Sequence, residues 1–142
     1  AIKEALDEGA LVTLLVDRAR PGNQMSAVSF LGEAAPFPTG PWQIAAALKV
    51  PVVLCFGLYR GGNRYHLHFE SFADVAQVER ARRGQHLREV TARFAARLEH
   101  HTRRAPYNWF NFYDFWQTEV SDPVRDADAD AAAGAVRHGG KA

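Results

Sequence analysis

Two uninterrupted apolar runs set the strongest limit on how this chain folds. They span residues 11–16 (LVTLLV) and 51–58 (PVVLCFGL), and neither alternates polar with apolar residues. Runs of this length, rich in Val and Leu, are typical of strands buried on both faces of a sheet. Between them, residues 41–49 carry an apolar stripe behind Thr39, a plausible helix N-cap. By the right-handed crossover rule, the two runs predict a parallel pair of strands with this helix on one face.

A hairpin strand follows the second run. Gly61-Gly62-Asn63 is a predicted turn, and residues 64–72 then alternate between two faces. One face carries Tyr65, Leu67 and Phe69, whereas the other carries the polar side chains, namely Arg64, His66, His68 and Glu70. We therefore expect a third strand that is antiparallel to the second and half exposed.

A long amphipathic helix is predicted near the end of the chain. Between residues 85 and 103, apolar residues recur at steps of three and four, at Leu87, Val90, Phe94 and Leu98. Pro106 ends this helix shortly afterwards. Together these elements predict an α/β fold with a mixed sheet, in which a parallel pair and an antiparallel hairpin strand are flanked by helices.

The two ends of the chain differ from the middle. Residues 1–8 are good helix formers with Gly9 as a C-cap, but no N-cap precedes them. We expect either that an upstream segment has been cut away or that this short helix docks on the core. Residues 120–142 are acidic and Ala-rich, which predicts a disordered tail behind a folded part over residues 1–119.

Composition excludes several classes of protein. The single cysteine, Cys55, permits no intrachain disulfide, and its place within the second run predicts a small buried hydrophobe. No apolar run reaches the 18 residues that a membrane-spanning helix needs. His66 and His68 share a strand face but have no third ligand at a suitable spacing, so we expect no metal site. The net charge of +1 gives no sign of a nucleic-acid partner.

The first candidate site lies between Asp17 and Gly40. This segment follows the first apolar run, and loops after buried strands often carry binding residues. Arg18 and Arg20 lie in it, and the helix that opens with Thr39 and Gly40 presents backbone N–H groups that favour an anion such as phosphate. The alternative interpretation is that Thr39 only caps the helix and the arginines are solvated.

The long helix and the segment after it are further candidates. Residues 75–104 hold eight Arg against three Glu, a formal charge of +5. They predict either contacts with phospholipid head groups or nucleic acid, or a solvent face with ion pairs of Glu79 with Arg83 and Glu89 with Arg93. Residues 107–116 (YNWFNFYDFW) hold seven aromatics, which predicts core packing, interface anchoring or, less well, base stacking.

The order and spacing of these features resemble one protein family. Asp17 closes the first run, Thr39 and Gly40 open a helix, and an Arg-rich helix precedes APYNWFNFYDFW. Further matching features are Phe30-x-Gly32, Ile44-Ala45, Pro51-Val52-Val53, the Gly-containing hairpin and Pro106-x-x-Trp109. Across about 110 residues, the chain is similar to the carboxyl-terminal part of the lipid A late acyltransferases, within the lysophospholipid acyltransferase-like superfamily. The aromatic ending looks more like the branch associated with bacterial pigment or glycolipid pathways.

The resemblance implies a reaction and a location. Members of this family transfer a fatty acyl group from acyl-carrier protein or coenzyme A to a hydroxyl of a lipid or glycolipid acceptor. They act at the cytoplasmic face of the bacterial inner membrane and use an HxxxxD motif, whose His is the general base. None of the six histidines here is followed by Asp five positions later. The resemblance therefore implies a soluble carboxyl-terminal fragment whose catalytic pair lies upstream of Ala1.

What remains would form the acceptor side of the site. The resemblance implies substrate binding by Asp17, Arg18 and Gly32 in the loop after the first run, and by Thr39 and Gly40 at the start of the helix. No cofactor is expected beyond the acyl thioester as co-substrate, and nucleic acid is not expected as a partner. The alternative hypothesis is a non-catalytic module that binds a membrane surface or a protein through the Arg-rich helix and the aromatic segment.

Overall fold

The part of the chain that the structure describes contains two β-hairpins, three α-helices and a 3-10 turn. The computed structural model describes residues 2–18, 22–73 and 82–116. In order, the elements are α1 (Ile2–Asp7), β1 (Met25–Phe30), β2 (Glu33–Pro38), α2 (Gly40–Leu48), β3 (Val52–Tyr59), β4 (Tyr65–Ala73), α3 (Arg83–Arg104) and the 3-10 turn η2 (Pro106–Asn108). The fold is therefore mixed α/β, as predicted. The predicted tail at 120–142 lies outside the described residues.

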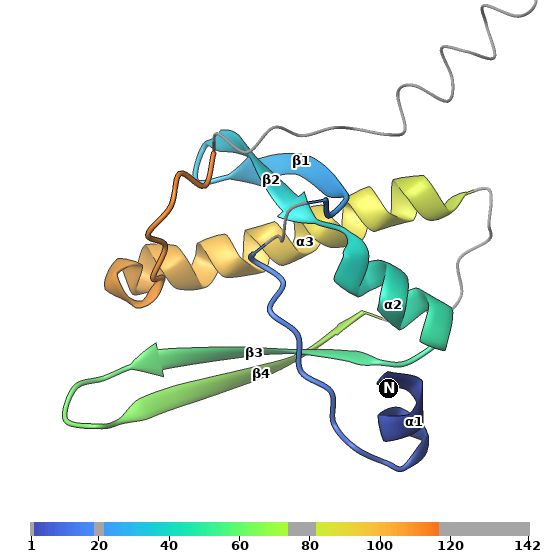
Figure 1. Cartoon of the computed structure of the whole chain (residues 1–142). Helices are drawn as coiled ribbons and strands as arrows, with labels where there is room; N and C mark the ends of the chain where they lie inside the picture. Colours follow the sequence, from blue (N-terminus) through green and yellow to red (C-terminus); the bar gives the residue numbers. More distant parts are fainter. Residues whose placement is uncertain (1, 19–21, 74–81, 117–142) are drawn as a thin grey trace, which may run out of the picture.

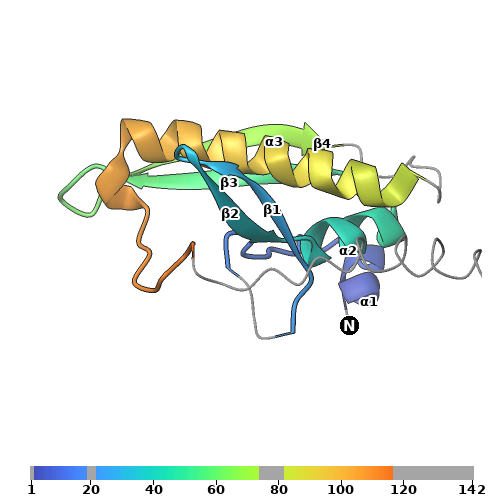
Figure 2. The ribbon, with the colours of Figure 1, turned by 90° about the horizontal axis from the view of Figure 1, so that it is seen from above.

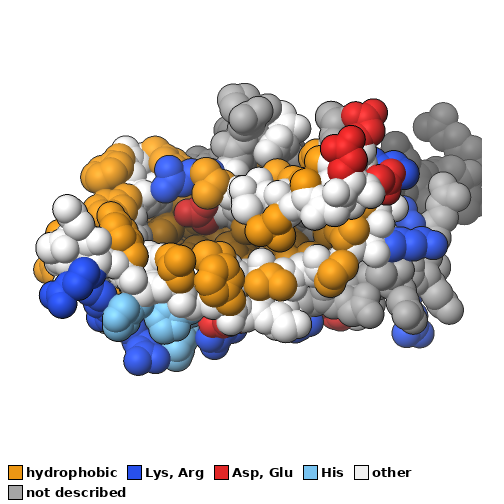
Figure 3. Space-filling model, turned by 90° about the horizontal axis from the view of Figure 1, so that it is seen from below, with side chains coloured by type: hydrophobic (Ala, Val, Ile, Leu, Met, Phe, Trp, Pro, Cys, Tyr) orange, Lys and Arg blue, Asp and Glu red, His pale blue; other side chains and the backbone are white. Residues whose placement is uncertain are grey.

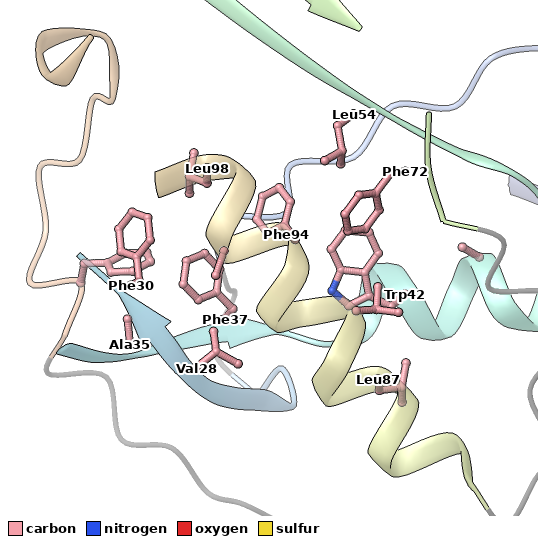
Figure 4. Close-up of a cluster of buried hydrophobic side chains, with 14 residues drawn as sticks. Val28, Phe30, Ala35, Phe37, Trp42, Leu54, Phe72, Leu87, Phe94 and Leu98 are labelled. Carbon is pink, nitrogen blue, oxygen red and sulfur yellow. The ribbon is translucent and has the colours of Figure 1, made fainter. Parts of the chain in front are cut away.

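Helix α3 is the centre of the molecule. The hairpin β1–β2 lies on one side of it and the hairpin β3–β4 on the other, while α2 packs beside it (Figures 1 and 2). The buried stripe of α3 repeats at helical spacing, as predicted, and includes Leu87, Val90, Phe94 and Leu98. These side chains meet aromatic rings from the other elements (Figure 4). Phe94, for example, lies 5.9 Å from Phe37 and 5.5 Å from Trp42 between ring centroids.

The predicted parallel pair of strands is wrong. Residues 11–16 form no regular secondary structure, and both sheets in the described part of the chain are antiparallel and two-stranded. Leu11, Leu14 and Leu15 are exposed, and Val16 alone of this run packs on the core. An apolar run becomes a strand buried on both faces only when a neighbouring strand and two covering layers are available. Here α3 covers one side of β3, and nothing described covers the other.

The β1–β2 hairpin was not predicted. Its strands pair from Met25 opposite Pro38 to Phe30 opposite Glu33, and the connection is Leu31-Gly32. Both turn residues have positive φ, 54° and 97°, which matches the twist of a two-residue hairpin. Leucine is rare in that conformation, and the prolines of β2 argue against a strand, so the residues conceal the hairpin.

The remaining predicted elements are confirmed within a few residues. The helix expected at 41–49 is α2, the strands expected at 51–58 and 64–72 are β3 and β4, and the helix expected at 85–103 is α3. The predicted turn at 61–63 closes the antiparallel β3–β4 hairpin, where Arg60 N–H donates to the Arg64 carbonyl at 2.8 Å.

The β3–β4 hairpin turns its apolar residues outward. Tyr65, Leu67 and Phe69 are exposed, while Glu70 points toward α3. The prediction that Cys55 is buried is wrong, because Cys55 pairs with Phe69 on the same outward face and is exposed. In a sheet with one covered face, the apolar side normally packs on the core. Strand β4 therefore has the reverse of the usual arrangement.

A polar cluster holds β4 in this orientation. Arg97 of α3 donates two hydrogen bonds of 2.7 Å to the Glu70 carboxylate, and His101 Nε2 lies 2.9 Å from Glu70 Oε1. The His101 ring is buried and stacks on Phe56 at 4.2 Å between centroids. The Arg97 hydrogen bonds, opposed by burial and supported by His101, lower the pKa of Glu70 from 4.5 to about 2. Glu70 is therefore ionised over the whole physiological range of pH.

Replacing Glu70 tests this cluster. The Glu70→Gln variant should lose about 1–2 kcal/mol of stability at neutral pH, since Arg97 is partly exposed and screened. Because folding lowers the pKa of Glu70 from 4.5 to about 2, its contribution is complete above the upper value and is lost as pH falls toward the lower one. The stability difference between wild type and variant, from urea unfolding, should therefore shrink as pH falls from about 5 toward about 2.

The matched control is Glu89→Gln, which changes an exposed carboxylate on α3, the helix of Arg97; this carboxylate accepts a hydrogen bond from Gln85. This variant should stay within about 0.5 kcal/mol of wild type. A Glu70→Gln variant as stable as wild type at neutral pH would contradict the assigned role.

Candidate functional site

Asp17 and Arg18 lie against the aromatic segment, 92 to 96 residues further along the chain. Arg18 donates a hydrogen bond of 3.0 Å to the carbonyl of Phe110, and its Nε lies 3.7 Å from Asp17 Oδ2. The hydroxyl of Tyr113 donates to the carbonyl of Asp17 at 3.4 Å. The Asp17 side chain is 18% exposed, whereas that of Arg18 is 50% exposed. The Phe110 carbonyl and Asp17 thus orient the guanidinium, and its exposed half is accessible to an anion from solvent.

Tyr113 supports this arrangement as a neutral donor. Burial, and then the nearby carboxylate of Asp17, raise the pKa of the Tyr113 phenol above its ordinary value of 10.0. The phenol therefore keeps its proton at physiological pH. The sequence did not predict that Tyr113 and Phe110 lie near Asp17 and Arg18. Both hydrogen bonds are accepted by backbone carbonyls, which every residue type has.

Thr39 and Gly40 stand at the junction of β2 and α2. The N–H of Thr39 donates to the Gln24 carbonyl at 3.0 Å, and its hydroxyl donates to the same oxygen at 3.3 Å. Thr39 makes no side-chain cap hydrogen bond, so the interpretation that it caps the helix in that way is wrong. Gln43 Nε2 instead reaches both Thr39 Oγ1 and Gln24 Oε1, the latter at 2.7 Å.

Few N–H groups at the start of α2 remain for an anion. Pro41 has none, and the N–H groups of Trp42 and Gln43 donate to the Thr39 carbonyl, each at 3.1 Å. An anion at this helix end would therefore be bound chiefly through Gly40 N–H. Fewer backbone N–H groups are therefore free at this helix start than the residue pattern predicts.

Gly32 lies apart from the other predicted site residues. It is the second residue of the β1–β2 turn, at the far end of β2 from Thr39, about 20 Å away by the length of a six-residue strand. The neighbouring Leu31 N–H donates to Glu99 Oε2 at 2.8 Å, a bond that, with a smaller contribution from Arg103, lowers the pKa of Glu99. The positive φ of Gly32 explains the glycine without any substrate contact.

The arginines of α3 take specific partners rather than the predicted ones. Arg93 donates to the Phe72 carbonyl at 2.8 Å and lies over the Phe72 ring, whereas the prediction paired it with Glu89. Arg103 pairs with Glu99 at 2.7 Å. The other predicted pair involves Glu79, which lies outside the described residues.

The aromatic segment is divided between core and surface. Phe115 is buried and contacts Phe30 and Phe37, and Trp109 packs against the core. Tyr107 and Phe112, in contrast, are about nine-tenths exposed. The core interpretation therefore holds for part of the segment, and its other rings face outward.

Comparison with known proteins decides the family. The sequence profile of the bacterial lipid A biosynthesis acyltransferases matches residues 1–118. The chain belongs to this family. No curated protein and no solved structure matches the chain. Membership of an acyltransferase family supports a transferase that acts on lipids, and Asp17, Arg18, Thr39 and Gly40 all lie within the matched residues.

Other features of this acyltransferase-family chain do not extend the site. A hollow of about 450 Å³ is lined by Ser29, Ala92, Ala96, Glu99, His100 and Arg103. It includes no residue of the predicted site, and its charged pair, Glu99 with Arg103, is already satisfied. Among residues 2–18, 22–73 and 82–116, no three His, Cys, Asp or Glu side chains gather as metal ligands. In the same ranges, no helix is long and apolar enough to cross a bilayer.

Substituting Gly32 separates a turn role from a binding role. In this acyltransferase chain, Gly32→Ala should lower stability by about 1–2 kcal/mol, because an L side chain is strained at a φ of 97°. The matched control is Gly40→Ala, where φ is ordinary and an added Cβ meets nothing within 4 Å, so its melting temperature should not fall. If Gly32→Ala has the same melting temperature as wild type in thermal unfolding, the role assigned to Gly32 in the turn is wrong.

Proposed function

We propose that this chain is the acceptor-binding, carboxyl-terminal portion of a bacterial acyltransferase. The enzyme would move a fatty acyl group from acyl-carrier protein or coenzyme A to a hydroxyl of a lipid or glycolipid. The family match over residues 1–118 carries the proposal. The half-exposed Arg18, oriented by Phe110 and flanked by Asp17, supports a site for an anionic group of the acceptor.

The catalytic base belongs to a segment outside these 142 residues. The family resemblance implies a His and an Asp in an HxxxxD pair, and no histidine of this chain has Asp at that spacing. In the proposed reaction, the His takes the proton of the acceptor hydroxyl, whose oxygen attacks the thioester carbonyl. The C–O ester bond forms, the C–S bond breaks, and the proton passes to the departing thiolate. The segment with this pair is proposed to lie upstream of Ala1.

Residues of this chain would position the acceptor. Arg18 would pair with a phosphate or carboxylate, and Gly40 N–H at the start of α2 would offer a second, weaker donor. Asp17 would hold the guanidinium, as its 3.7 Å contact suggests. The aromatic ending resembles the pigment- or glycolipid-associated branch, so a glycolipid at the cytoplasmic face of the inner membrane is the proposed acceptor.

Arg18 provides the test. In the enzyme that includes the HxxxxD segment, Arg18→Ala should raise the KM for the acceptor about tenfold or more, the loss of one charge-assisted hydrogen bond. The KM for the acyl donor should not change. The control variant Arg88→Ala removes an exposed arginine of α3 and should leave both constants unchanged. An unchanged acceptor KM in Arg18→Ala rejects the proposed role.

A membrane-surface module is the second candidate. The observation that favours it is the exposure of Tyr107 and Phe112 in the segment that follows the basic last turn of α3, which contains Arg103 and Arg104. Exposed aromatic rings beside cations are typical of surfaces that bind anionic bilayers.

Vesicle sedimentation distinguishes this candidate. A membrane module should bind phosphatidylglycerol vesicles, release them as salt rises, and bind at least about tenfold more weakly when Tyr107 and Phe112 are both changed to Ser. The control variant Ile44→Ser alters a partly exposed residue on α2 and should bind as wild type. Binding that is absent, or insensitive to both salt and the double substitution, excludes the module.

A further inference from the structure

The outward face of the β3–β4 hairpin is apolar and uncharged. Residues that share this face through the strand register are Val53, Cys55, Gly57, Tyr59, Tyr65, Leu67, Phe69 and Ser71. Tyr65, Leu67 and Phe69 are 63%, 59% and 67% exposed. Apolar side chains form a band across this side of the molecule; basic and histidine side chains gather at one end, and acidic and basic side chains lie at the other (Figure 3). We refer to these eight residues as the outer face.

The outer face has the character of a buried protein interface. Strand β3 is apolar on both sides, since Leu54 and Leu58 pack inward while Val53 and Tyr59 point outward. Strands with this pattern are typical of sheets that are covered on both faces. Aromatic and aliphatic side chains without charge are also the composition of interface cores. A large exposed apolar area of this kind marks a binding surface.

The outer face adjoins the candidate site. Asn108 Oδ1 accepts a hydrogen bond from Tyr59 N–H at the end of β3. Two residues further along, the Phe110 carbonyl accepts the hydrogen bond from Arg18. A body that covers the outer face would therefore lie beside Asp17 and Arg18.

We propose that the outer face is the docking surface for the polypeptide segment that carries the HxxxxD pair. This inference rests on the proposed function and names the partner of its site. Docking buries Leu67 and Phe69 and brings the catalytic base beside Arg18. A bilayer fits less well, because the cations Arg60 and Arg64 stand at the turn end of the hairpin and the outer face itself has no charged residue.

The single cysteine of this chain reports whether the outer face is covered. Cys55 is exposed at the centre of the face, opposite Phe69. The experiment compares maleimide labelling of Cys55 in this 142-residue chain with labelling in the longer polypeptide that includes the HxxxxD segment, after any other cysteine there is changed to Ser. Labelling in the longer polypeptide should be slower by about tenfold or more.

A matched control places the thiol elsewhere. In a Cys55→Ser background, Ser29→Cys puts the thiol at an exposed position of the largely buried strand β1, across α3 from the outer face. This thiol should react at similar rates in both polypeptides. Slower labelling of Cys55 alone therefore reports coverage of the outer face rather than a general loss of reactivity.

The outcomes separate this inference from the proposed function. Equal Cys55 labelling in an active longer polypeptide overturns the inference and leaves the proposed function intact. Protection in an inactive polypeptide supports docking and counts against the proposed function. A reading frame that encodes no HxxxxD upstream overturns both. Protection that arises only at high concentration of the 142-residue chain, or only with phosphatidylglycerol vesicles, assigns the outer face to a second copy or a bilayer and overturns the inference.

Discussion

The hydrogen bonds between Glu70 and Arg97 determine which side of the β3–β4 hairpin meets the rest of the molecule. If the strand faced the other way, Tyr65, Leu67 and Phe69 would be buried, but the carboxylate of Glu70 would lose both Arg97 and His101. The same turn would expose Leu54, Leu58 and Phe72, which are buried now, so the hydrophobic effect distinguishes only weakly between the two faces. The polar cluster therefore selects one of two apolar faces, and a partner on the outer face would bury the side chains that stay exposed.

Periodic features of the sequence predict most of the fold. The apolar stripe of α3 and the hairpin turn at 61–63 each depend on local spacing, and the structure confirms both. Pairing between segments is harder to predict. The run at 11–16 has the composition of a central strand, but composition does not reveal whether a neighbouring strand is present. The β1–β2 hairpin is a pairing that the sequence does not predict. Prolines are unusual in paired strands, and leucine is unusual in a turn at positive φ, as Leu31 is here.

The candidate site was predictable only in part. Arg18, Thr39 and Gly40 follow from general rules about loops and helix starts, whereas the contacts that orient them do not. Gln24 and Gln43 hold Thr39 through a carbonyl and an amide, and Phe110 holds Arg18 through its carbonyl. Backbone groups are the same at every residue, so such contacts are visible only in three dimensions. Gly32 differs from these residues. It matches a motif of the family, but its positive φ in the β1–β2 turn is enough to explain why a glycine stands there.

The contacts of Arg18 with Phe110 and of Tyr113 with Asp17 also bear on how the site assembles. Each joins residues more than ninety positions apart, while the two hairpins and α3 depend on near neighbours in the sequence. Closing so long a loop carries a large entropic cost, which is recovered only after the intervening elements have formed. Arg18 should thus be oriented late in folding, and a chain with both hairpins and α3 formed can still lack an ordered candidate site.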